Sequence, residues 1–100
     1  MTASRVDYNL EGPAPEAESV LHTAIRLTQG DRGRDYGTPK DNWGRTATIA
    51  SALVGKPLTA EECVKVAMAM KYARLIQTPN HLDSIVDLAG YAWVLSEVMR

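Results

Sequence analysis

The chain has 100 residues, of which 45% are apolar and 23% charged, and its formal net charge is −1. This length corresponds to one domain, and this composition supports a packed core, which excludes an intrinsically disordered chain. A charge near zero excludes the global basic field that binds duplex nucleic acid, and no apolar run is long enough to span a membrane. The single cysteine, Cys63, excludes an internal disulfide framework. The first residues also lack the apolar stretch of a secretory signal, so we expect a cytoplasmic protein.

Residues 1–14 contain glycine and proline and show no helical period, which predicts an extended or mobile arm. Residues 15–100 are predicted to form a single helical domain. A first helix is expected from Pro15 to Gln29, because proline suits a first turn and apolar residues then recur at helical spacing. Gly30 is expected to cap the end of this helix.

The next segment, which ends at Gly37, is predicted to be a loop with a capacity for anion binding. Its arginines carry forked donors that suit phosphate, and its glycines let backbone N–H groups approach an anion closely. A tyrosine is available to stack on a ring. The candidate ligand-binding residues of the loop are Arg32, Arg34, Tyr36 and Gly37. The spacing matches neither a Walker loop nor a dinucleotide fingerprint, so a plain polar connection is the alternative.

Capping residues predict where the second and third helices begin. Thr38 is a good N-cap and Pro39 suits the first helical position, so a helix is expected to start there and to end at Gly55. The third helix is expected to start with the capping box formed by Thr59 and Glu62.

The third helix is predicted to run to about Gln77, because Pro79 prevents its continuation. Asn80 is expected to cap a last helix that runs nearly to Met99. The short connection predicts that these two helices form an antiparallel hairpin. The fold class is therefore all-α, with about four helices.

The last helix is apolar over most of its circumference, which is typical of a helix buried on several sides. Its apolar residues are Leu82, Ile85, Val86, Leu88, Ala89, Trp93, Val94, Leu95 and Val98. A chain of this length offers little protein to surround such a helix. We therefore expect a homo-oligomer that covers one of its faces.

Charged residues are expected to meet inside this hairpin. Lys71 and Arg74 share one helix face, while Asp83, Asp87 and Tyr91 share a face of the last helix. Folding about residue 79 places Lys71 level with Asp87, and Arg74 level with Asp83 or Ser84. One interpretation is a pair of salt bridges that fix the register of the hairpin. The other is a ligand-binding or catalytic site, because buried ion pairs often fail to recover their desolvation cost and charged clefts are commonly functional.

Four runs of sequence resemble a family of uncharacterised small proteins common in bacteriophage and prophage genomes. They are Arg34–Gly37, Asn42–Trp43, Lys71–Arg74 and Asp83–Tyr91, within a resemblance that covers about residues 20–98. The resemblance implies a protein of the bacterial host cytoplasm, and it carries no established activity.

More distantly, the run from Asp87 to Leu95 resembles the final motif of the all-α nucleoside triphosphate pyrophosphohydrolases of the MazG and dimeric dUTPase kind. That resemblance implies Mg²⁺ held by carboxylates on two helices, with Asp83 and Asp87 as candidate ligands. The other metal-binding helix of those enzymes presents paired glutamates, whereas this chain presents Lys71 and Arg74. Hard cations need clustered oxygens, so the charges fit phosphate recognition better than magnesium binding.

The favoured interpretation is a phage-type nucleotide-binding protein that uses no metal cofactor and binds a nucleotide or another phosphorylated small molecule. In this interpretation Arg32, Arg34, Lys71 and Arg74 hold phosphates, Tyr36 or Tyr91 stacks or hydrogen-bonds, and Asp83 and Asp87 orient the cations or contact a ribose. The phage resemblance adds the hypothesis that the protein sequesters a nucleotide signal of bacterial immunity.

Two alternatives remain open from the sequence. The first is a Mg²⁺-dependent nucleotide pyrophosphohydrolase in which Asp83 and Asp87 are metal ligands and a third carboxylate comes from elsewhere. The second is a structural or regulatory protein whose charges only fix the fold. Enzymatic activity is thus undecided, with binding favoured over hydrolysis.

Overall fold

The computed structural model describes residues 15–30 and 37–100, with side chains from residue 20 onward. These residues form four helices and contain no strand: α1 (Pro15–Gln29), α3 (Pro39–Val54), α4 (Ala60–Gln77) and α5 (Leu82–Val98). The predicted all-α class with four helices is confirmed. The predicted arm, residues 1–14, and residues 31–36 of the predicted loop lie outside the described residues.

The predicted ends of α3 and α4 are confirmed by their capping hydrogen bonds. The Thr38 hydroxyl accepts from the backbone N–H of Asp41 at 3.1 Å, and Gly55 ends α3 with a left-handed φ of 87°. At the start of α4 the Thr59 hydroxyl accepts from the Glu62 N–H at 3.0 Å, while the Glu62 carboxylate accepts from the Thr59 N–H at 2.9 Å. These caps satisfy backbone donors that a helix leaves unpaired at its first turn.

The predicted cap of the last helix is wrong by one residue. His81, not Asn80, is the N-cap of α5, and its Nδ1 accepts from the backbone N–H of Ser84 at 3.3 Å. The turn after α4 uses Asn80, because the His81 N–H bonds back to the Thr78 carbonyl at 3.0 Å. The imidazole then supplies the acceptor that a serine or aspartate supplies at most helix starts.

The end of α1 lies at the predicted position, just before Gly30. Gly30 follows the last helical residue, and its N–H donates to the Arg26 carbonyl at 3.0 Å. Its φ is not positive; among the described glycines, Gly37 and Gly55 are the left-handed ones. Gly30 therefore ends the helix without the left-handed cap that glycine often provides.

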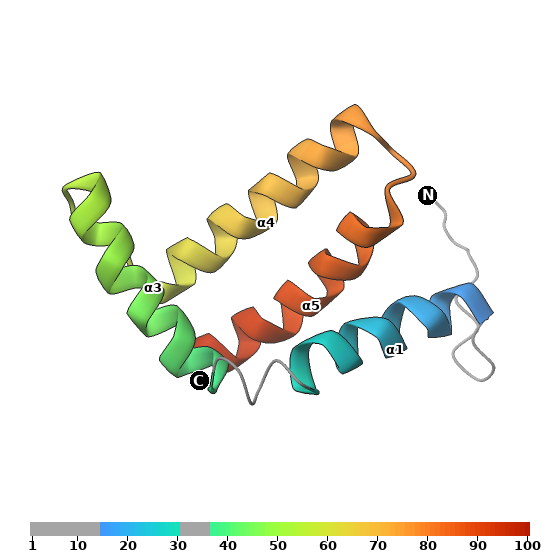
Figure 1. Cartoon of the computed structure of the whole chain (residues 1–100), viewed down its shortest axis with the longest axis horizontal. Helices are drawn as coiled ribbons and strands as arrows, with labels where there is room; N and C mark the ends of the chain where they lie inside the picture. Colours follow the sequence, from blue (N-terminus) through green and yellow to red (C-terminus); the bar gives the residue numbers. More distant parts are fainter. Residues whose placement is uncertain (1–14, 31–36) are drawn as a thin grey trace.

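Helix α5 lies at the centre of the molecule, in contact with α4, α1 and α3. It runs beside α4 in the opposite direction, and α1 packs along its other side (Figure 1). The approach of α1 is close at Gly90, where an added Cβ would lie 3.0 Å from the Thr28 methyl group. This central position accounts for the burial of Ser84, Val86, Gly90 and Val94, whereas Leu82 and Ile85 of the same helix are 58% and 39% exposed.

The connection from α3 to α4 is held by one serine. The Ser51 hydroxyl accepts from the Leu58 N–H at 2.8 Å and lies 3.3 Å from the Leu58 carbonyl oxygen, to which it donates. The residues after Gly55 therefore fold back along the last turn of α3. This reversal places the start of α4 against α3, with which it is in contact.

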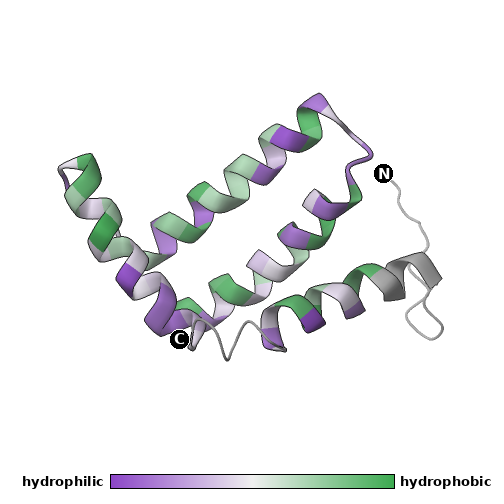
Figure 2. Ribbon diagram, in the orientation of Figure 1, coloured by the Kyte–Doolittle hydropathy of each residue, from purple (hydrophilic) through white to green (hydrophobic). Residues whose placement is uncertain are grey.

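The described part of the chain has a core of small side chains: Ala24, Ala47, Cys63, Val64, Val86 and Val94. Many larger apolar residues are exposed. Figure 2 shows that hydrophobic segments recur along all four helices. The most exposed of them are on α3 and α4, with Leu53 at 82% and Ile76 at 84%. The surplus apolar surface is therefore not concentrated on the last helix. None of the described helices is both long and apolar enough to cross a membrane.

Candidate functional site

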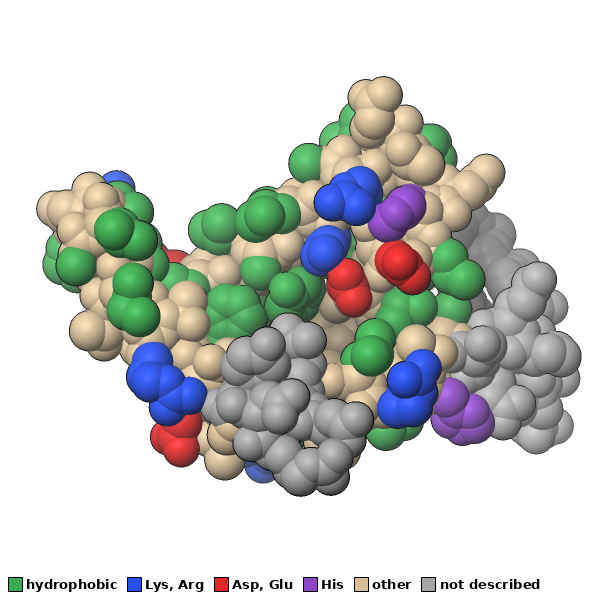
Figure 3. Space-filling view, in the orientation of Figure 1, with side chains coloured by type: hydrophobic (Ala, Val, Ile, Leu, Met, Phe, Trp, Pro, Cys, Tyr) green, Lys and Arg blue, Asp and Glu red, His purple; other side chains and the backbone are tan. Residues whose placement is uncertain are grey.

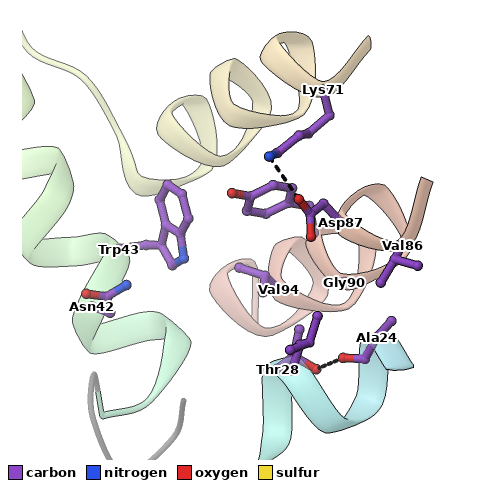
Figure 4. A pocket seen from close by; sticks show the side chains of 11 residues that line it. Ala24, Thr28, Asn42, Trp43, Lys71, Val86, Asp87, Gly90 and Val94 are labelled. Atoms are coloured by element: carbon purple, nitrogen blue, oxygen red, sulfur yellow. Dashed lines mark hydrogen bonds and ion pairs between the residues drawn. The ribbon is translucent and has the colours of Figure 1, made fainter. Parts of the chain in front are cut away.

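A pocket of about 230 Å³ opens where all four helices meet (Figure 4). Side chains from each helix point toward the same space, Ala24 and Thr28 from α1, Trp43 from α3, Lys71 from α4 and Asp87 from α5. The lining residues are Ala24, Leu27, Thr28, Asn42, Trp43, Lys71, Val86, Asp87, Gly90, Tyr91 and Val94. The pocket thus combines apolar walls with a few polar groups, the usual composition of small-molecule sites.

An ion pair crosses one wall of this pocket. The Lys71 Nζ lies 2.8 Å from Asp87 Oδ2, and the two side chains are 26% and 35% exposed. Lys71 lies in the second half of α4 and Asp87 in the second turn of α5, so the pair joins two helices at the register predicted from the sequence. Asp87 is the one acceptor that Lys71 contacts among the described residues, although an ammonium group carries three donors.

The wall contributed by α3 is aromatic and polar. The rings of Trp43 and Tyr91 are in edge-to-face contact, with centroids 6.0 Å apart and planes at 81°. Asn42 stands beside Trp43 and also lines the pocket. Within the described part of the chain, no hydrogen bond occupies the Asn42 amide, the Trp43 indole N–H or the Tyr91 hydroxyl. These groups are available to a ligand, which fits the arrangement of convergent polar groups in an apolar pocket.

The second predicted charge pair is not in the pocket. Arg74 and Asp83 are exposed, are absent from the pocket lining and are not joined to each other by an ion pair. Basic, acidic and histidine side chains nevertheless gather on the face of the molecule where α4 meets α5 (Figure 3). Of the residues predicted from the hairpin, the structure therefore brings Lys71, Asp87 and Tyr91 together.

The predicted loop contributes one described residue near the pocket. Arg32, Arg34 and Tyr36 lie outside the described residues. Gly37 lines a smaller hollow of about 50 Å³ that shares Thr28, Asn42, Trp43 and Val94 with the pocket. The loop thus ends next to the aromatic wall.

The described residues contain no group of three or more histidine, cysteine, aspartate or glutamate side chains that could hold a metal ion. The glutamates at the start of α4 are engaged locally. Glu61 contacts the Lys65 Nζ at 2.6 Å, and Glu62 caps the helix at Thr59. They do not join Asp83 and Asp87 in the carboxylate cluster that Mg²⁺ requires.

Sequence reasoning missed the contributions of α1 and α3 to the pocket. Thr28, Asn42, Trp43 and Gly90 were not among the predicted site residues, yet all of them line the pocket. A usable signal was present for two of them, because Asn42–Trp43 directly follows the Thr38–Asp41 cap and is one of the runs that carry the phage resemblance. The positions of Thr28 and Gly90 depend on how α1 crosses α5.

Comparison with known proteins places the chain among phage proteins. Residues 19–99 match the family model described as a domain of unknown function (DUF6378). The Gene 55 protein of Mycobacterium phage L5 is 38% identical over 81 residues, which are 80% of this chain and 52% of that protein. The Gene 55 protein of Mycobacterium phage D29 is 34% identical over 82 residues, which are 82% of this chain and 54% of that protein.

The chain spans about half the length of these curated relatives. No solved structure matches it significantly. The names of the two relatives state no activity, and none of these comparisons supports the more distant resemblance to MazG-like enzymes. The family model covers most of the chain and both relatives are phage proteins, and the chain therefore belongs to the DUF6378 family.

Proposed function

We propose that this chain binds a nucleotide or another phosphorylated small molecule in the pocket between its four helices. The observation that carries the proposal is the half-buried Lys71–Asp87 pair in the wall of a pocket that also presents Trp43 and polar groups to which no described residue is hydrogen-bonded. A salt bridge that only fixes the register of two helices does not require a cavity beside it. A binding site requires both charged groups and a cavity that can hold the ligand.

Lys71 is the proposed phosphate contact. Asp87 takes one donor of its ammonium group and fixes its position, which leaves other donors for a phosphate oxygen. Charge-assisted hydrogen bonds of this kind are shorter and stronger than neutral ones. Arg74 follows Lys71 by three residues on α4 and is exposed, and its proposed role is to contact phosphates that extend beyond the pocket.

The aromatic wall is the proposed contact for the base or the sugar. Trp43 offers a ring face or edge, and the Asn42 amide and Tyr91 hydroxyl offer hydrogen bonds. The cavity of about 230 Å³ is smaller than the roughly 300 to 1,000 Å³ typical of small-molecule sites. It is thus suited to hold part of a nucleotide, with the remainder outside. Arg32, Arg34 and Tyr36 are proposed to contribute from the loop, and Asp83 from the start of α5.

Binding without hydrolysis is the favoured activity. The pyrophosphohydrolase alternative needs a third carboxylate near Asp83 and Asp87, and the described residues form no such cluster. In a phage protein of the host cytoplasm, tight binding of an intact nucleotide would remove a signal that bacterial immunity uses. This role is proposed from the phage membership of the family together with the site.

The test is a binding titration with a matched pair of lysine variants. Nucleoside triphosphates, cyclic dinucleotides and ADP-ribose are titrated into the protein by calorimetry, with and without Mg²⁺. Lys71→Met is expected to weaken binding by roughly 10-fold to 100-fold, because it removes a charge-assisted contact. Lys65→Met is the control, because Lys65 is on the same helix and pairs with a carboxylate but lies away from the pocket.

Equal affinities in the two variants would contradict the proposed site. Absence of binding by every probe would contradict nucleotide binding itself. Metal-dependent and protein-dependent release of pyrophosphate would instead favour the hydrolase alternative.

A further inference from the structure

Helix α1 differs from the other helices in how it is attached to the molecule. Its backbone comes within 8 Å of α5, measured between Cα atoms, and of no other described helix. The other three helices all contact one another. Figure 1 shows the same arrangement, with α1 alongside α5 and apart from α4. The described helices therefore divide into a unit of α3, α4 and α5 and a single helix that packs against one side of it.

Specific side-chain contacts hold the three-helix unit together. The Lys71–Asp87 ion pair joins α4 to α5, and the edge-to-face contact of Trp43 with Tyr91 joins α3 to α5. The Ser51 hydroxyl holds the connection between α3 and α4. These contacts fix three walls of the pocket relative to one another.

The seam between α1 and α5 is made of small residues. Among the side chains of α1 that the structure describes, Ala24 is the buried one. Thr28 lies against Gly90, but its hydroxyl donates at 2.7 Å to the Ala24 carbonyl of its own helix. Leu21 and Ile25 of α1 remain 57% and 52% exposed. The described part of α1 therefore buries little apolar surface against α5, and the hydrophobic stabilisation of this contact is small.

A hollow lies on each side of this seam. One is the pocket of about 230 Å³, and the other is a space of about 360 Å³ lined by α1 and α5 alone. Both are bordered by Ala24, Thr28 and Gly90, so contact between the two helices is narrowed to these residues. Segments with few buried apolar contacts are the ones that open locally in native proteins, and the elements that close over binding sites are drawn from them.

We propose that α1 is a movable wall of the pocket, which docks on the α3–α4–α5 unit and undocks from it, and that a ligand in the pocket favours the docked state. The coupling to a ligand rests on the proposed function, whereas the motion rests on the seam. Ala24, Leu27 and Thr28 of α1 line the pocket, and Figure 4 shows Ala24 and Thr28 facing it beside Gly90. Undocking therefore removes one wall and opens the pocket to solvent. A ligand that contacts this wall binds the docked state more tightly and shifts the equilibrium toward it.

The contact of Thr28 with Gly90 offers a way to change the docking equilibrium. A Cβ at Gly90 would lie 3.0 Å from the Thr28 methyl group, so Gly90→Ala is expected to push α1 away from α5. Thr28→Ser deletes that methyl group and keeps the hydroxyl that donates to the Ala24 carbonyl. The double variant Thr28→Ser/Gly90→Ala is therefore expected to dock again. Gly44→Ala on α3 is the matched control, because nothing lies within 4 Å of a Cβ at that position.

Hydrogen exchange of backbone amides, followed by NMR, measures the undocking. An isolated helix of 15 residues is marginal in water, so α1 loses its internal hydrogen bonds when it undocks. In the unliganded chain, the amides of residues 24–28 are expected to exchange at least about 10-fold faster than those of residues 86–94 on α5. Gly90→Ala is expected to accelerate the exchange of α1 at least about 5-fold further, with α3 and α4 changed by less than about 2-fold. The double variant should return to the rate of the unsubstituted chain, and Gly44→Ala should not depart from it.

ATP, ADP-ribose and a cyclic dinucleotide are then added as probes. Any of them that binds is expected to slow the exchange of residues 24–28, by a factor that rises with its concentration. Gly90→Ala should weaken that binding, because a smaller fraction of the chain is docked. The double variant should recover the affinity. If Gly90→Ala lowered affinity only by filling the pocket, the double variant would recover the exchange rate and not the affinity, which would contradict the coupling.

The remaining outcomes separate the motion from the ligand. Equal exchange rates for α1 and α5 in the unliganded chain, or equal acceleration of all helices by Gly90→Ala, would overturn the movable wall. A probe that binds without slowing the exchange of α1 would overturn the coupling and leave the proposed function standing. If no probe binds, the proposed function fails and the coupling fails with it, while exchange in the unliganded chain still decides the motion.

Discussion

Helix α4 carries two lysine–carboxylate pairs that differ in what they join. Lys65 contacts Glu61 on the same helix, four residues away, and the two side chains are 56% and 39% exposed. Lys71 contacts Asp87 on α5 with side chains that are 26% and 35% exposed. The first pair stabilises a helix that its capping box already starts. The second pair links two helices, borders the pocket and depends on the packing around it.

The difference shows how the same two residue types serve local and tertiary structure. A pair four residues apart forms wherever the helix forms, and an exposed pair of this kind contributes only a few tenths of a kcal/mol. A pair between helices forms only when the helices pack in one register. Because such a pair is partly removed from water, breaking it leaves one poorly solvated charge and lowers stability. Charged groups in a cleft are also common at ligand-binding sites.

The largest expected effect is on the packing next to the Lys71–Asp87 pair. Gly90→Val is expected to lower the free energy of unfolding by about 1–3 kcal/mol, because its Cβ would meet the Thr28 methyl group at 3.0 Å and α1 would have to move. The control is Gly44→Val, since nothing lies within 4 Å of a Cβ at Gly44. It should change stability by less than about 0.5 kcal/mol. Urea denaturation measures both, and equal losses at the two glycines would show that the close approach of α1 is unimportant.

A smaller loss is expected from breaking the interhelical pair itself. Lys71→Met should cost about 1–2 kcal/mol, between the values for exposed and for fully buried pairs, because both side chains retain some contact with water. The measurement is the melting temperature together with the urea midpoint.

The double variant Lys71→Met/Asp87→Leu distinguishes a structural pair from a ligand site. A structural pair predicts a single-variant loss of about 3–5 kcal/mol that the double variant restores, with ligand affinity unaffected by any of these changes. The proposed site predicts the smaller loss in stability and the larger loss in affinity. The first result would remove the basis for the proposed function.

The smallest effect is expected for the local pair. A double-mutant cycle on Glu61 and Lys65 should give a coupling of about 0.3–0.5 kcal/mol, as for exposed pairs on one helix. In 1 M salt, where charges are screened over roughly 3 Å, most of this coupling should disappear. The Lys71–Asp87 coupling is expected to be larger and to persist further. A local coupling equal to the interhelical one would remove the contrast between the two pairs.

The sequence predicts the helices well because their ends are encoded by neighbouring residues. The predicted capping hydrogen bonds are formed by Thr38 and by the Thr59–Glu62 box. The predicted end of α3 is formed by Gly55. The one misplaced cap, at Asn80, lies in the short turn where two residues compete for the same role. His81 is the N-cap because its ring nitrogen accepts a hydrogen bond from the Ser84 N–H.

The sequence predicted only the part of the site that depends on the register between α4 and α5. A short turn after Gln77 was enough to place Lys71 opposite Asp87. Thr28 and Trp43 reach the pocket through the crossing of α1 and α3 over α5, which no local pattern encodes. Crossing angles depend on side-chain packing between helices, so the sequence alone does not predict that these residues line the pocket.

The described core contains no apolar side chain larger than valine. Each methyl group removed from water contributes under about 1 kcal/mol, so a single copy of the chain has few such contributions to set against the entropy of ordering its backbone. Binding equilibria can therefore contribute a large share of the stability of the native chain. Any molecule that binds the native chain and not the unfolded one adds a term that grows with the logarithm of its concentration. The free energy of unfolding of this chain is therefore expected to rise with the concentration of any molecule that binds its native state.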